Sequence, residues 1–166
     1  SFDAFDETSY LASHSDLLDA YGTSTTSAIN HYIEYGYGEG RILDKFNEFS
    51  YVASHTDLID DIGADAEAAT AHYVNTGYSE GRAVDTFDEF GYIASHSDLI
   101  ESIGSDAAAG AEHYITTGYA EGRTITFDAS LYLARHEDVR AVYGNDEELA
   151  KQHYINNGYD EGRVIA

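Results

Sequence analysis

The eight histidines are the residues whose chemistry stands out first, because imidazole can bind a metal ion, transfer a proton or form structural hydrogen bonds. They fill two recurring positions separated by 17 residues, namely His14, His55, His96 and His136, then His31, His72, His113 and His153. No pair has the H-x-x-x-H spacing that places two imidazoles on one helix face. The pattern therefore favours hydrogen-bonded core or capping histidines over a zinc or copper site.

Four tyrosines form a second recurring group, and each directly follows a glycine that we expect to end a helix: Tyr37, Tyr78, Tyr119 and Tyr159. Aromatic rings at regular spacing along one edge can stack on sugar faces, while their hydroxyl groups make polar contacts. Glycan binding is therefore one hypothesis for these residues. Packing of the same rings between neighbouring repeats is the other.

Half of the eight basic residues stand at one recurring position, at the end of a Glu-Gly-Arg turn: Arg41, Arg82, Arg123 and Arg163. A guanidinium group that recurs in so acidic a chain is expected to form a bidentate pair with a carboxylate. Asp16 and Glu39 are the candidate partners of Arg41, from its own or an adjoining repeat. We predict a structural ion pair at this position.

Motifs for catalysis are missing from the sequence. It contains no G-x-S-x-G elbow, P-loop or G-x-G-x-x-G fingerprint, and Ser13-His14 and its counterparts lack a third, orienting residue. We therefore predict that the chain is not an enzyme and has no catalytic residues. No EF-hand register is present either, although so acidic a surface leaves calcium open as a bound ion. No other cofactor is expected.

The composition narrows the possible partners. The chain has 166 residues, with 8 Lys and Arg against 31 Asp and Glu, a formal charge of −23, and no Cys, Met, Trp or Pro. This charge argues against binding to nucleic acid or to an anionic membrane, and no apolar run approaches the ~18 residues of a membrane span. The expected partner is a protein or a polysaccharide.

These candidate residues all recur because the chain is one unit repeated four times. Phe5, Phe46, Phe87 and Phe127 each open a unit, and the steps between them are 41, 41 and 40 residues. The shared pattern is F-[DN]-x-x-x-Y-[LVI]-A-[SR]-H-x-D-[LV], followed by H-Y-[IV]-x-x-G-Y-x-E-G-R. We therefore expect a single repeat domain, 1–166, with units at about 5–45, 46–86, 87–126 and 127–166.

Each unit carries helix start and stop signals. Asp6 follows Phe5 and precedes Tyr10 by four residues, which are the places of an N-cap and a hydrophobic staple. A break at His14 puts Asp16 in the first turn of a second helix, and Gly22 can end that helix with positive φ. A last helix is expected from Ser24 to Gly36. The predicted fold is all-α, a tandem repeat of four units with two to three short helices each, stacked as a short solenoid or compact helical array.

The unit resembles a tandem repeat of large secreted bacterial proteins, especially alphaproteobacterial proteins of the RTX and serralysin-like type. The motifs F-D-x-x-x-Y-[LI]-A-S-H-x-D-L and H-Y-x-x-x-G-Y-x-E-G-R carry the resemblance, which covers essentially the whole chain. It implies a secreted, extracellular, structural or accessory module. The chain lacks the G-G-x-G-x-D-x-U-x calcium-binding nonapeptide of RTX proteins, so calcium binding is not carried over to it from the resemblance.

We therefore expect a non-catalytic extracellular module that serves as a structural spacer, assembly unit or adhesion element of a larger protein. A glycan-binding module and a divalent-cation-binding module, through calcium or histidine ligands, are the alternatives. The last repeat has the polar residues of a terminal cap: Arg135, Arg140, Glu147, Glu148, Lys151 and Gln152. Residues 1–4 have no such character, so we expect the N-terminal end to continue into another domain or to contact a partner chain, including a second copy by self-association.

Overall fold

The computed structural model describes residues 5–164, and these form helices without any strand. The prediction of an all-α tandem repeat of four units is confirmed. The chain divides into two compact units after Thr86, which is the boundary expected between the second and third repeats. Each compact unit therefore contains two repeats. The N-terminal residues 1–4, expected to contact a partner, lie outside the described residues.

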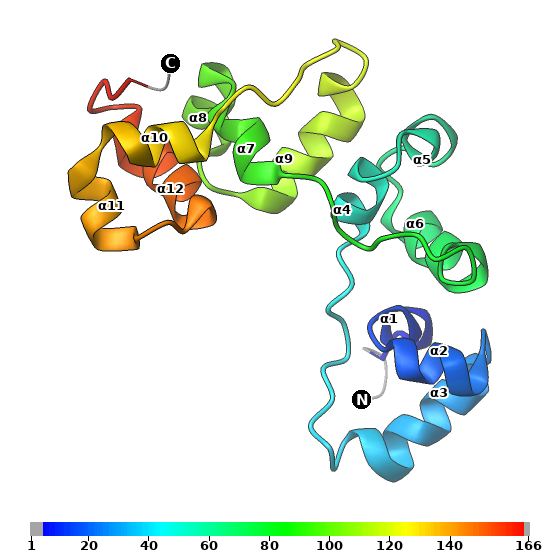
Figure 1. The fold of residues 1–166 in the computed structure, drawn as a ribbon. Helices are drawn as coiled ribbons and strands as arrows, with labels where there is room; N and C mark the ends of the chain where they lie inside the picture. Colours follow the sequence, from blue (N-terminus) through cyan, green and yellow to red (C-terminus); the bar gives the residue numbers. More distant parts are fainter. Residues whose placement is uncertain (1–4, 165–166) are drawn as a thin grey trace. The chain divides into compact units, whose positions relative to one another are not determined.

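Each repeat contains three short α-helices and a π-helical turn that continues the third (Figure 1). Repeat 1 has α1 Glu7–Ala12, α2 Ser15–Tyr21, α3 Thr25–His31 and η1 Tyr32–Gly36. Repeat 2 has α4 Glu48–Ala53, α5 Thr56–Asp61, α6 Ala66–His72 and η2 Tyr73–Gly77. Repeat 3 has α7 Glu89–Ala94, α8 Ser97–Ile103, α9 Ala107–His113 and η3 Tyr114–Gly118. Repeat 4 has α10 Ala129–Arg135, α11 Glu137–Tyr143, α12 Glu147–His153 and η4 Tyr154–Gly158. Within the described residues, none of these helices could cross a membrane.

The helix boundaries follow from local capping. Asp6 Oδ1 accepts hydrogen bonds from the backbone of Thr8 and Ser9, at 2.8 and 2.9 Å, and so caps α1. The ring of Phe5 lies 5.3 Å from that of Tyr10, which forms the expected staple. His14 has extended backbone angles, φ −137° and ψ 95°, and separates α1 from α2 as predicted.

The end of the third helix differs from the expected regular α-helix. Its last five residues widen into a π-helix, in which the amide of Tyr37 donates to the carbonyl of Tyr32 at 2.9 Å. In this wider turn the backbone of Gly36 lies against the hydroxyl of Tyr10, and a Cβ atom at that position would overlap it. The same turn and the same glycine contact occur in every repeat.

The core of each repeat is built around one tyrosine of its first helix, and all four of these tyrosines are fully buried: Tyr10, Tyr51, Tyr92 and Tyr132. Inside each compact unit, the first helix of the leading repeat also packs on the end of the following repeat. In the first unit α1 contacts α6 and η2, and in the second α7 contacts α12 and η4. Through this contact between repeats, the first helix of the leading repeat covers apolar residues of the repeat that follows it.

Candidate functional site

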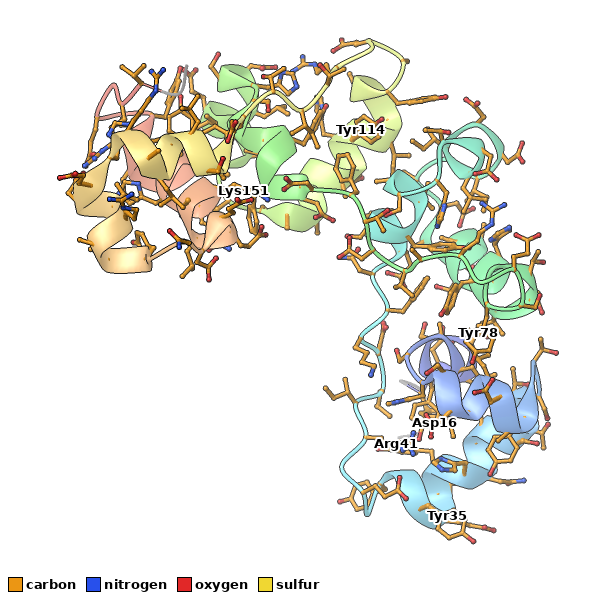
Figure 2. All side chains as sticks on the ribbon, viewed as in Figure 1. Asp16, Tyr35, Arg41, Tyr78, Tyr114 and Lys151 are labelled. Carbon is orange, nitrogen blue, oxygen red and sulfur yellow. The ribbon has the colours of Figure 1, made fainter. Side chains whose placement is uncertain are left out.

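The recurring arginine joins two segments of its own repeat. Arg41 Nη2 lies 2.8 Å from Asp16 Oδ2, and its Nε lies 2.7 Å from Glu39 Oε2 (Figure 2). The other arginines make the same two contacts: Arg82 with Asp57 and Glu80, Arg123 with Asp98 and Glu121, and Arg163 with Asp138 and Glu161. Hydrogen bonding to the guanidinium lowers the pKa of each of these aspartates, that of Asp138 to about 2. The chain after the π-helix is thereby tied to the start of the second helix.

Removing one such arginine should destabilise the protein by more than an isolated surface pair does. For Arg82→Ala we expect the free energy of unfolding to fall by more than about 1 kcal/mol, because two carboxylates lose their charge-assisted partner. Urea denaturation followed by circular dichroism would measure this loss. The control is Arg140→Ala, an exposed arginine outside the recurring position, which should change stability little. A melting temperature of Arg82→Ala equal to that of the wild type would contradict the prediction.

In three of the four repeats the first histidine holds the linker that leaves that repeat. His14 Nε2 donates to the carbonyl of Ile42 at 2.9 Å. The counterparts bond in the same way, His55 to Ala83 at 2.8 Å and His136 to Val164 at 3.0 Å, whereas Nε2 of His96 is buried without a hydrogen bond. Burial lowers the pKa of His14 and of His96. His14, His55 and His136 therefore anchor the linkers that leave their repeats.

The second histidine meets the buried tyrosine. Tyr10 Oη and His31 Nδ1 are 3.1 Å apart, and the corresponding pairs in the other repeats are each 2.9 Å apart. Desolvation raises the pKa of the buried tyrosine in every repeat. The pKa is raised to about 12 for Tyr51, Tyr92 and Tyr132. Both histidines of a repeat thus flank one tyrosine ring. Among residues 5–164, no group of three or more His, Cys, Asp or Glu is placed to hold a metal ion.

The four tyrosines of the proposed glycan edge do not share one environment. Tyr78 Oη donates to Asp19 Oδ1 of the preceding repeat at 2.7 Å, and Tyr159 Oη donates to Glu101 Oε1 of its preceding repeat at 2.9 Å. Each bond raises the pKa of its tyrosine. Tyr119 is partly buried, whereas Tyr37 is 77% exposed. Within each compact unit, this position therefore forms part of the contact between repeats.

Some apolar residues are exposed in repeat 1, although the equivalent residues of other repeats are buried. Ile33 is 56% exposed, whereas its counterparts Val74, Ile115 and Ile155 are 7%, 6% and 5% exposed. Tyr35, on the same π-helical turn, is also 56% exposed, but its counterparts Thr76 and Asn157 are exposed as well (Figure 2). We call Ile33 and Tyr37 the N-terminal face. It is the same face that α1 covers on repeat 2 and α7 covers on repeat 4.

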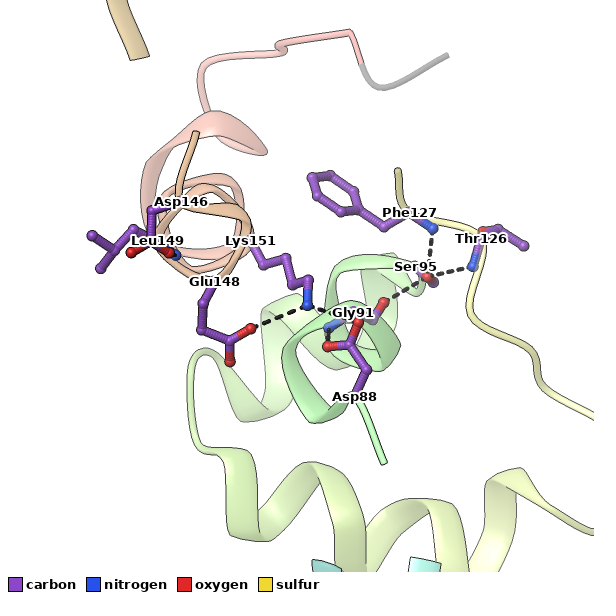
Figure 3. A network of polar contacts seen from close by, with 9 residues as sticks. All are labelled: Asp88, Gly91, Ser95, Thr126, Phe127, Asp146, Glu148, Leu149 and Lys151. Carbon is purple, nitrogen blue, oxygen red and sulfur yellow. Dashed lines mark hydrogen bonds and ion pairs between the residues drawn. The ribbon is translucent and has the colours of Figure 1, made fainter. Parts of the chain in front are cut away.

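Sequence patterns missed one ionic contact between repeats. The sequence predicts Lys151 only as part of the polar cap of the last repeat. In the structure its Nζ lies 2.8 Å from Asp88 Oδ2 and 3.1 Å from Glu148 Oε2 (Figure 3). Asp88 also caps α7 through its other oxygen, which accepts from the amide of Gly91. The signal in the sequence was a lone lysine at a position that is uncharged in the other repeats. The carboxylate with which Lys151 pairs depends on which helices pack together, here α12 and α7.

Comparison with protein-family models, with curated proteins and with solved structures gave no match for this chain. The candidate site therefore stands on the geometry of its own repeats. Equivalent positions of the four repeats differ in their environment, because only repeats 2 and 4 follow another repeat of the same compact unit.

Proposed function

We propose that this chain is a non-catalytic assembly module, and that its N-terminal face docks another repeat of the same kind. The proposal is supported by one observation: Ile33 and Tyr37 are exposed in repeat 1. In repeats 2 and 4 the counterparts of Ile33 are buried, and those of Tyr37 bond to the preceding repeat. An apolar face with a known mode of coverage is a specific interaction surface rather than a scattered set of exposed side chains.

The contacts within each compact unit define what the partner must offer. Tyr78 reaches a carboxylate on the second helix of the preceding repeat, and Tyr159 does the same. The acidic position is filled by Asp19, Asp60 and Glu101 in the first three repeats but by Ala141 in the last. The partner is therefore a repeat that keeps this acidic residue, carried by another segment or chain. The last repeat of this protein is not the complement, since it has no carboxylate for Tyr37.

As part of the same proposal, the module works outside the bacterial cell as an assembly or spacer element of a secreted protein. The resemblance of the repeats to those of secreted bacterial proteins supports this setting. The charge of −23 also suits it, because strong net charge keeps similar repeated units from aggregating.

The docking mode can be tested by replacing residues 1–4 with a second copy of residues 5–45, which keeps the 41-residue step between successive repeats. If a repeat is the right occupant, Ile33 and Tyr37 of the original repeat 1 should become protected, as Val74 and Tyr78 are. Amide hydrogen exchange around η1 would slow, and the chain should melt at a higher temperature. Tyr37→Ala should reduce this gain in the extended chain and have little effect in the original one, where the ring is largely exposed.

Two outcomes would overturn the proposed partner. Unchanged exchange around η1 in the extended chain would show that a repeat does not cover the face. Concentration-dependent dimers of the original chain that Tyr37→Ala abolishes, measured by light scattering, would instead identify a second copy as the occupant.

A further inference from the structure

A pocket of about 330 Å³ lies where repeat 1 meets repeat 2 in the first compact unit. Its acidic walls are Asp6, Glu48 and Glu67, and Thr8 and Thr70 also line it. Asp6 lies at the start of α1, and Glu67 lies in the first turn of α6. Neither forms an ion pair with any residue that the structure describes. Thr70 Oγ1 donates to Glu48 Oε1 at 3.2 Å, so the floor of the pocket is also polar.

The second compact unit shows what the equivalent residues bind. Asp6 and Glu67 correspond by repeat position to Asp88 and Glu148, and these two carboxylates hold the ammonium group of Lys151 (Figure 3). The lysine stands at the position of Thr70. Its side chain is only 14% exposed, so the ammonium reaches the carboxylates along a largely covered path.

A second difference between the units enlarges the space. The position of Thr8 in repeat 1 is filled by Phe90 in repeat 3, and that ring packs on the core of the second unit. The first unit has a short threonine at both places, and it keeps the two acidic residues. Carboxylates that face an open pocket without a cation repel one another, and a positively charged group between them would relieve this.

We propose that this pocket is a binding site for a primary ammonium group on an unbranched alkyl chain, supplied by a free amine or by a lysine of a partner protein. The ammonium would take the place that Lys151 Nζ holds in the second unit, between Asp6 and Glu67, and the alkyl chain would fill the space beside Thr8 and Thr70. A metal ion fits less well, since calcium requires six to eight oxygen ligands. An ammonium group needs only two or three acceptors.

The test is a titration of the complete chain with n-butylammonium chloride at low ionic strength, followed by amide chemical shifts. We expect saturable shifts confined to the surroundings of Thr8, Glu67 and Thr70. Thr70→Lys should abolish these shifts and raise the melting temperature, because it builds the internal cation of the second unit into the first. The matched control is Thr76→Lys, which changes the net charge equally at an exposed position outside the pocket and should leave binding intact.

A second variant keeps the test independent of the folding of Thr70→Lys. Asp6→Asn combined with Glu67→Gln should weaken binding by roughly tenfold or more, since both charged acceptors are lost. Asparagine still caps α1, because Asn47 fills the same role in repeat 2. Tighter binding of Nα-acetyl-lysine N-methylamide than of n-butylammonium would identify a protein lysine as the source, and equal binding a free amine.

The proposal fails if the shifts spread over the whole acidic surface, or if tetramethylammonium gives the same shifts, because both results indicate diffuse attraction of cations. It also fails if calcium chloride saturates the same residues at lower concentration. Unchanged binding to Thr70→Lys would likewise overturn it, since the ligand would then lie elsewhere.

Discussion

Replacing Tyr92 with alanine should lower the stability of the second compact unit by about 4 kcal/mol, as for other large aromatic residues removed from a core. The Tyr92 side chain is fully buried, and its ring lies 5.6 Å from that of Phe87 and 5.3 Å from that of Tyr114. Its hydroxyl is hydrogen-bonded to Nδ1 of His113 at 2.9 Å. The substitution therefore leaves a cavity and an unpaired histidine nitrogen. Urea denaturation followed by far-ultraviolet circular dichroism measures the loss.

The matched control for this prediction is Tyr37→Ala, which removes the same side chain from a position that is 77% exposed. Its free energy of unfolding should stay within about 0.5 kcal/mol of the wild type. Equal effects of the two substitutions would show that burial of the first-helix tyrosine does not organise the repeat.

Gly77→Ala should be the most damaging of the small substitutions, with a loss of about 2 kcal/mol. A methyl group at this position would overlap the hydroxyl of Tyr51 and press on the ring of Tyr73 at 3.3 Å. The intrinsic preference of a helix for alanine over glycine acts in the opposite direction but is smaller, at about 1 kcal/mol. Thermal and urea denaturation of the complete chain would measure the net effect.

A double-mutant cycle identifies the cause of this loss. Tyr51→Phe removes the overlapping hydroxyl, together with its hydrogen bond to His72. If the overlap dominates, Gly77→Ala should cost less in the Tyr51→Phe background than in the wild type. Gly38→Ala is the control, because Gly38 lies in an exposed turn where the other repeats already have Ser79, Ala120 and Asp160. Purely additive losses would contradict the proposed contact.

Much of the local structure could be predicted from single residues and their spacing. Asp6 and Phe5 mark the start of α1, and the extended backbone of His14 stands where the pattern indicated a break. Arg41 lies between Asp16 and Glu39, the two acids that its turn suggested. These features depend on contacts within one repeat, and four copies of the pattern made each signal visible.

Contacts between repeats could not be predicted in the same way. Tyr37 and Tyr78 stand at the same position of the repeat, yet one is largely exposed and the other bonds to Asp19. Lys151 and Thr70 likewise share a position, yet one fills its site and the other leaves an acidic pocket. The π-helical form of η1 also gave no sequence signal, since its spacing of apolar residues fits an ordinary helix.

The sequence by itself determined the number of repeats, their helical character, and the caps and ion pairs inside each one. Only the tertiary structure decided which face of a repeat is covered, which tyrosines bond to the preceding repeat and which acidic residues pair with a lysine. The physical reason is that capping and helix propensity act over a few residues and are the same in every copy. Burial and pairing, by contrast, depend on which neighbour a copy has, and identical motifs can therefore have different environments and different functions.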